Sequence, residues 1–207
     1  MCIRDSIRAH QLDAIAQAAA ALNTTPWVMA PMIASPREAA AFAAEVRGRG
    51  MVPGVMVEIP AAAILAHAIL AEVDFVSIGT NDLTQYTMAA DRMSADLAAL
   101  TDPWQPAVLK LIESVATAGQ ELGKSVGVCG EAAADPNLAC VLTGLGVTSL
   151  SSAPVAAAGV GARLAEVTLD DCRAAAAAAL ATADPGDARA AAAEVLDAAA
   201  TRHATAV

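Results

Sequence analysis

The chain has 207 residues, 57% hydrophobic and 16% charged, so it can bury a core and differs from the charge-rich chains that stay disordered. Its 12 Lys and Arg against 22 Asp and Glu give a formal net charge of −10, opposite to the basic surface of a nucleic-acid binder. No stretch reaches the roughly 18 uninterrupted apolar residues of a membrane helix, and the first residues lack the apolar core of a signal peptide. We expect a cytoplasmic protein without a nucleic-acid or membrane partner.

Four cysteines stand at Cys2, Cys129, Cys140 and Cys172. Their spacing contains no Cys-x-x-Cys pair and no histidine at zinc-finger distance. This pattern argues against a zinc site and against a disulfide framework. We therefore expect reduced thiols.

Short β-rich runs that end in Gly, Pro, Ser or Asn alternate with alanine-rich helical stretches, which is typical of βα units on a parallel sheet. The strands are nearly continuous apolar runs, as expected of strands covered on both faces. In chain order we predict them at residues 27–33, 55–59, 75–78, 125–129 and 147–151.

Prolines mark the starts of the helices between these strands, with Ser35 and Asp135 as N-caps and Gly123 ending the longest helix. The chain divides into an N-terminal helical segment (1–26), an α/β part (27–182) and a helical tail (183–207). Five βα units are too few for an eight-stranded barrel, which needs about 250 residues. The sheet is therefore either open or part of a barrel.

Polar residues follow the carboxyl ends of two neighbouring predicted strands. Glu58 follows the run at 55–57, and Asp82 closes Gly79-Thr80-Asn81-Asp82 after the next strand. Ligands bind at this end of a parallel sheet, and Mg²⁺ is held by one or two carboxylates with substrate oxygens and water. The alternative is that Asp82 caps the following helix and Glu58 pairs with an arginine, and the spacing leaves both open.

Two further residues are candidates at this carboxyl end of the sheet, which we call the rim. Arg92 could lean back over it as a bidentate anchor for a phosphate or carboxylate, or else form a surface ion pair with Asp91 or Asp96. Cys129 stands beside Gly130 at a strand end, where a thiol can act as nucleophile or proton donor. Its alternative is a small buried hydrophobe at a tight turn.

Four motifs in this order resemble the phosphoenolpyruvate (PEP)-binding domain of enzyme I of the bacterial phosphotransferase system. They are GVMVEIP at 54–60, DFVSIGTNDLTQY at 74–86, ADR at 90–92 and GVCGE at 127–131. The resemblance extends over about residues 27–180. Pyruvate phosphate dikinase and PEP synthase carry related motifs, but the run YTMAADR at 86–92 is similar to enzyme I rather than to either.

The resemblance implies an eight-stranded (βα)8 TIM-type barrel, present here as a partial barrel of about five βα units. It implies PEP-protein phosphotransferase activity with Mg²⁺ as cofactor, held by Glu58 and Asp82. Asn81 and Arg92 would bind the substrate, and Cys129 would protonate the enol carbon.

In that family the phosphoryl group passes to a histidine on a separate domain and on to a small phosphocarrier protein of sugar transport, leaving pyruvate. The resemblance also implies a homodimeric parent. The phosphohistidine domain, the carrier-docking region and the first barrel strands are absent, so we expect an inactive fragment whose first six residues (1–6) are non-native. A non-catalytic dimerisation or regulatory module is the alternative from another class.

Overall fold

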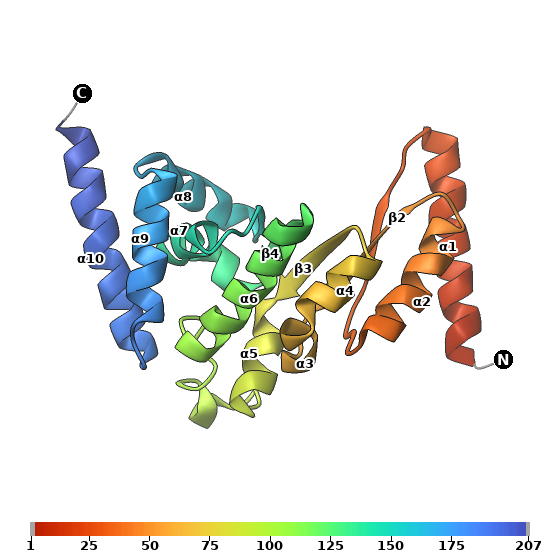
Figure 1. Ribbon diagram of the computed structural model, residues 1–207, viewed down its shortest axis with the longest axis horizontal. Coiled ribbons are helices and arrows are strands. Elements are labelled where there is room, and N and C mark those ends of the chain that lie inside the picture. Colours follow the sequence, from red (N-terminus) through yellow and green to blue (C-terminus); the bar gives the residue numbers. More distant parts are fainter. Residues whose placement is uncertain (1–2, 206–207) are drawn as a thin grey trace.

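The computed structural model describes residues 3–205, so Cys2 lies outside the described part of the chain. Five strands alternate with helices in this part (Figure 1). The strands are β1 (Trp27–Ala30), β2 (Val52–Val57), β3 (Phe75–Gly79), β4 (Ser125–Cys129) and β5 (Ser149–Ser151). The α-helices are α1 (Ile3–Leu22), α2 (Pro36–Arg47), α3 (Pro60–Ile64), α4 (Ala66–Glu72), α5 (Thr80–Met88), α6 (Pro106–Leu122), α7 (Pro136–Gly144), α8 (Pro154–Ala165), α9 (Leu169–Leu180) and α10 (Pro185–Ala204), with 3₁₀ turns η1 (Ala95–Leu97) and η2 (Glu131–Ala134).

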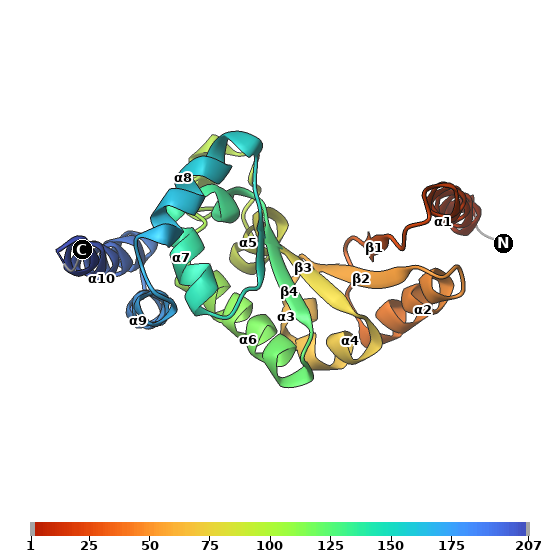
Figure 2. The same cartoon turned by 90° about the horizontal axis from the view of Figure 1, so that it is seen from above.

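All five strands form one parallel sheet in the order of the chain, β1-β2-β3-β4-β5. Each right-handed crossover then moves one strand in the same direction, which places the connecting helices on a single face. Figure 2 shows α2, α4 and α6 along the same side of β2, β3 and β4. This sequential winding is the arrangement of a TIM-type barrel, so the prediction of a partial barrel is confirmed.

The two faces of the sheet differ in composition because side chains alternate along each strand. Val55, Val57 and Ile78 point to the helical layer and are fully buried. The opposite face carries large side chains on β1, β2 and β3, namely Trp27, Met29, Met56 and Phe75. Farther along this face the side chains are small, and Ser77 is partly exposed. Within residues 3–205 the helices beside β2, β3 and β4 cover the first of these faces, so cover on both faces is not observed in this part of the chain.

The predicted helix starts follow from local chemistry. Ser35 forms a capping box with Glu38 at the start of α2. The carboxylate of Asp135 accepts hydrogen bonds from the first turn of α7, and Gly123 ends α6 with a φ of 63°. β1 ends at Ala30, before the predicted residue 33, and the chain turns just after it at Met32, whose φ is positive.

The C-terminal helices pack in sequence on the α/β part, α9 on α7 and α10 on α9. Arg163 on α8 binds Asn137 on α7 at 2.8 Å and pairs with Asp197 on α10. The face of α10 toward the core consists of fully buried small and aliphatic residues, Ala188, Ala192, Leu196 and Ala199. Among residues 3–205 no helix combines the length and apolar content that a membrane crossing requires.

Asp171, in the first turn of α9, connects this helix to the end of α10. Its carboxylate accepts a hydrogen bond from Thr168 at 2.6 Å and meets His203 Nε2 at 2.9 Å. These contacts hold the pKa of Asp171 well below its ordinary value. The carboxylate therefore stabilises the fold fully above the unfolded-state pKa of about 3.9, and this contribution is lost as the pH falls below it.

We expect Asp171→Asn to lower the free energy of unfolding at about pH 7 relative to the unsubstituted chain. By about pH 3 the difference in free energy between the two chains should be smaller. Urea unfolding followed by circular dichroism at both pH values measures the two gaps. The matched control is Asp170→Asn, because the Asp170 side chain is 88% exposed and its pair with Arg173 contributes little. An equal gap for Asp171→Asn at both pH values would contradict the assignment.

Candidate active site at the carboxyl rim of the sheet

Glu58 lies at the end of β2 as a buried carboxylate, only 6% exposed. Its Oε2 accepts a hydrogen bond from the backbone N–H of Met32 at 2.7 Å. Its side chain extends over Gly79 at the end of β3, where an added Cβ would lie 2.7 Å from Cγ and 2.9 Å from Oε1. Within the described residues no arginine pairs with Glu58, so the ion-pair alternative is not observed.

Asp82 lies in the first turn of α5, directly after β3. The N-cap of this helix is Gly79, and no side chain caps it, so Asp82 does not take the capping role of the alternative interpretation. Because Val57 pairs with Ile78, Glu58 and Asp82 follow the ends of adjacent strands. The described residues contain no group of three or more His, Cys, Asp or Glu suited to a metal. A cation held by these two carboxylates would need oxygens from a substrate or water.

Asn81 and Arg92 line one small cavity of about 180 Å³, together with Glu131. Asn81 Oδ1 accepts a hydrogen bond from the Glu131 backbone N–H at 3.1 Å, which leaves the amide nitrogen of Asn81 as a donor. The Arg92 backbone N–H binds Gln85 Oε1 at 3.1 Å. In the described part of the chain the Arg92 guanidinium forms no ion pair, so it is available to an anionic ligand.

Cys129 ends β4 and is partly exposed. Its Sγ donates to the carbonyl oxygen of Ile78 at 3.5 Å, and its own carbonyl accepts from Thr80 Oγ1 at 3.0 Å. The next residue, Gly130, has a φ of 106°, and a Cβ there would lie 2.7 Å from both Asn81 Oδ1 and Thr80 Oγ1. The ends of β3 and β4 therefore meet so closely that only glycine fits at residue 130.

Two residues of this rim were not among the predicted site residues. Glu131 belongs to the GVCGE motif, which was a usable signal, but its place in the cavity depends on the 3₁₀ turn that it begins. Met32 fixes Glu58 through its backbone in a conformation with a φ of 55°. Nothing in the sequence marks a methionine for that conformation, because non-glycine residues rarely adopt it.

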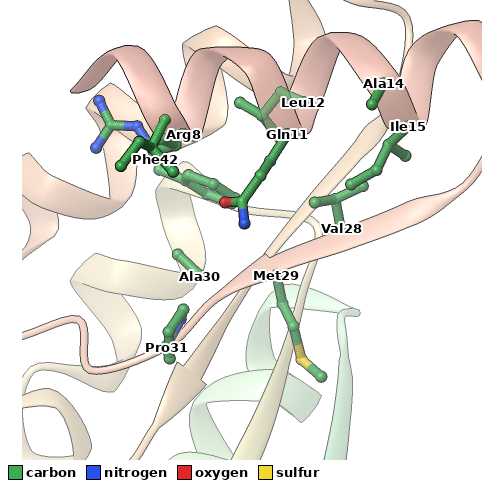
Figure 3. Close-up of a pocket in the computed structure, with 11 residues that line it drawn as sticks. Arg8, Gln11, Leu12, Ala14, Ile15, Val28, Met29, Ala30, Pro31 and Phe42 are labelled. Carbon is green, nitrogen blue, oxygen red and sulfur yellow. The ribbon is translucent and has the colours of Figure 1, made fainter. Parts of the chain in front are cut away.

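A larger cavity, of about 850 Å³, lies elsewhere, between α1 and β1 (Figure 3). Its walls are mostly apolar and include Ile15, Val28 and Phe42. Arg8 at its edge binds Glu45 at 2.6 and 3.1 Å. None of the predicted site residues lines this cavity, and its apolar walls do not suit a small multiply charged anion.

A family model described as "PEP-utilising enzyme, PEP-binding domain" matches residues 2–169. The chain belongs to this family. All the rim residues described above fall within the matched range. The match begins at residue 2 and ends at 169, whereas the motifs indicated about 27–180.

Relatives carry names that agree with the motifs. The chain is 56% identical over 173 residues to a phosphoenolpyruvate-protein phosphotransferase of Streptomyces coelicolor, covering 83% of this chain and 31% of that protein. It is 46% identical to the multiphosphoryl transfer protein of Rhodobacter capsulatus, covering 74% of this chain and 20% of that protein. It is 45% identical to the phosphoenolpyruvate synthase of Pyrococcus furiosus, covering 61% of this chain and 16% of that protein. The chain thus spans less than a third of each of these PEP-utilising proteins.

Proposed function

We propose that this chain is the PEP-binding segment of a phosphoenolpyruvate-protein phosphotransferase. The observation that carries the proposal is the cavity lined by Asn81 and Arg92, because Asn81 directly precedes Asp82 and follows the strand that pairs with the one ending before Glu58. A small anion with phosphate and carboxylate groups needs cationic and amide donors, and Arg92 and Asn81 supply both. The 56% identity to the Streptomyces coelicolor protein supports the same activity.

The donor set suits Mg²⁺ because Glu58 is buried over Gly79, with Oε2 bound to Met32 and Oε1 accepting no hydrogen bond from the described residues. We propose that Glu58 and Asp82 hold the cation. When bound, the cation offsets negative charge on the substrate oxygens. The burial of Glu58 keeps that carboxylate in one orientation, so little reorganisation is needed on binding.

In this proposal Arg92 and Asn81 orient PEP while its phosphoryl group leaves for a histidine on another domain of the parent. Arg92 offsets the charge that spreads over the phosphoryl oxygens during the transfer. The enolate that remains takes a proton at its methylene carbon from Cys129 Sγ, which yields pyruvate. The hydrogen bond of Sγ to the Ile78 carbonyl oxygen fixes the rotamer of the thiol at the rim.

The proposal includes the wider setting of the parent: a phosphohistidine domain, the small phosphocarrier protein that it serves, a homodimer and a cytoplasmic location. A PEP synthase is the second enzyme candidate, supported by 45% identity to the Pyrococcus furiosus protein. The YTMAADR run and the higher identity to the phosphotransferase favour the first. The complete set of rim residues argues against a module without catalysis.

Isothermal titration of PEP with and without Mg²⁺ tests the site. We expect magnesium-dependent heat of binding for the unsubstituted 207-residue chain. This heat should be lost in Glu58→Gln, because the amide cannot replace the buried carboxylate as a cation ligand. The matched control is Glu166→Gln at the end of α8, because the Glu166 side chain is 54% exposed and pairs with Arg163. The same substitutions are also made in a full-length protein that carries this segment. That protein provides the further strands that the site could need in order to bind PEP. Binding unaltered by Glu58→Gln in both settings would reject the metal assignment.

A further inference from the structure

Two cysteines outside the rim lie in the contact between α7 and α9. Cys140 and Cys172 are both buried, at 0% and 2% exposure, and both are free thiols. Gly144 on α7 shows how close the two helices are, because a Cβ there would lie 2.1 Å from the carbonyl oxygen of Cys172. Cys140 is four residues before Gly144, so both occupy the same face of α7. This face brings Cys140 against the first turn of α9.

The two thiols lie close enough for each to shift the pKa of the other. A hydrogen bond from Cys140 lowers the pKa of Cys172, although burial opposes this shift. The same bond and burial raise the pKa of Cys140. Cys172 is therefore the thiol that ionises first, and Cys140 is its neighbour within the contact.

We propose that Cys140 and Cys172 are a dithiol that hydrogen peroxide converts into a disulfide joining α7 to α9. The Cys172 thiolate attacks one peroxide oxygen, so that an S–O bond forms, the O–O bond breaks and hydroxide leaves to become water. The Cys140 sulfur then attacks the Cys172 sulfenic acid, forming the S–S bond and releasing a second water. Two thiols are oxidised by two electrons in total, and one peroxide is reduced to two waters.

The bond would close a loop that contains β5 and α8. The bond would fix α9 to α7, which directly follows the 3₁₀ turn η2. Glu131, the first residue of η2, lines the rim cavity. Closing a loop restricts the unfolded chain, so the oxidised form should resist urea better than the reduced form. The inference uses none of the proposed catalytic residues and is independent of the proposed function.

The test uses the full chain with Cys2→Ser and Cys129→Ser, so that only Cys140 and Cys172 remain as thiols. After peroxide treatment and removal of excess oxidant, we expect an intact mass lower by two hydrogen atoms. Trypsin cleaves after Lys124, Arg163 and Arg173. Digestion without reductant should then release peptides 125–163 and 164–173 still joined by the disulfide. The urea midpoint should rise and should return to its starting value with dithiothreitol.

A further Cys140→Ser substitution in the same background is the control. It leaves Cys172 to form a sulfenic acid that dimedone traps, without the loss of two hydrogens and without the linked peptides. Persistence of both free thiols under native conditions, while the urea-unfolded chain oxidises, would overturn the proposal. Oxidation that joins two chains instead of closing the loop would also overturn it.

Discussion

Replacement of Cys129 by alanine in a full-length protein that carries this segment is expected to slow pyruvate formation from PEP by about 100-fold or more, the usual contribution of a general acid. The thiol stands at the end of β4, on the strand next to β3, which leads into Asn81 and Asp82. Without it, water must protonate the enolate. A coupled assay that reduces the released pyruvate measures the rate.

Cys129→Ser separates the acid role from a structural one. In the native chain the Ile78 carbonyl oxygen accepts a hydrogen bond from Cys129 Sγ at 3.5 Å. Serine keeps a donor at this position, but the serine hydroxyl is a far weaker acid than a thiol. We expect serine and alanine to be similarly slow. Full activity of the serine variant would assign Cys129 a structural role, and full activity of both variants would reject the proposal for this residue.

The second large effect concerns stability. Gly144→Ala is expected to lower the free energy of unfolding by about 3 kcal/mol, at the upper end of the usual cost of overpacking. The new Cβ would lie 2.1 Å from the carbonyl oxygen of Cys172 and 2.4 Å from its carbonyl carbon, so the backbone of α9 must move. Urea unfolding followed by circular dichroism measures the change, as a lower midpoint with an unchanged slope.

Gly161→Ala is the matched control. Gly161 lies within α8, and apart from its chain neighbours and the backbone of this helix no atom lies within 4 Å of its added Cβ. Alanine in an open helical position should stabilise the chain by about 0.5–1 kcal/mol. A similar loss of stability in both variants would mean that the α7–α9 contact is looser than the structure indicates.

Much of the fold could be predicted from the sequence, because most of the strands are apolar runs with a strong terminator. The exception is β5, where Ser149 and Ser151 are exposed on either side of Leu150. The run at 125–129 matches β4 at both ends, and Asp135 caps α7 as expected. The boundaries of β1 and β2 were less accurate. Val52 joins the sheet through a hydrogen bond to the Pro26 carbonyl oxygen, a long-range contact that no local pattern contains.

The sequence indicates which residues follow the strand ends at the rim, but it does not indicate how their side chains are arranged. The motifs place Glu58, Asp82, Asn81 and Arg92 after neighbouring strands, and the structure does bring Asn81 and Arg92 to one cavity. The bond from the Met32 backbone to Glu58 depends on where the β1 loop turns, which is a property of the assembled sheet. The contact between α7 and α9, which carry Cys140 and Cys172, could not be predicted for a similar reason, because helical spacing does not indicate which helices meet.

The uncovered face of the sheet has a consequence for whatever packs there. Its middle row, across four paired strands, consists of Met56, Ser77, Gly127 and Ser149. A barrel interior is close-packed, so the small residues Ser77, Gly127 and Ser149 must be matched by bulky side chains from the opposite wall. Met56 and the ring pair of Trp27 and Phe75 already fill space on the β1–β3 part of the same face. The part of this face toward β5 therefore favours long side chains in any strands that pack against it, whereas the part toward β1 favours small ones.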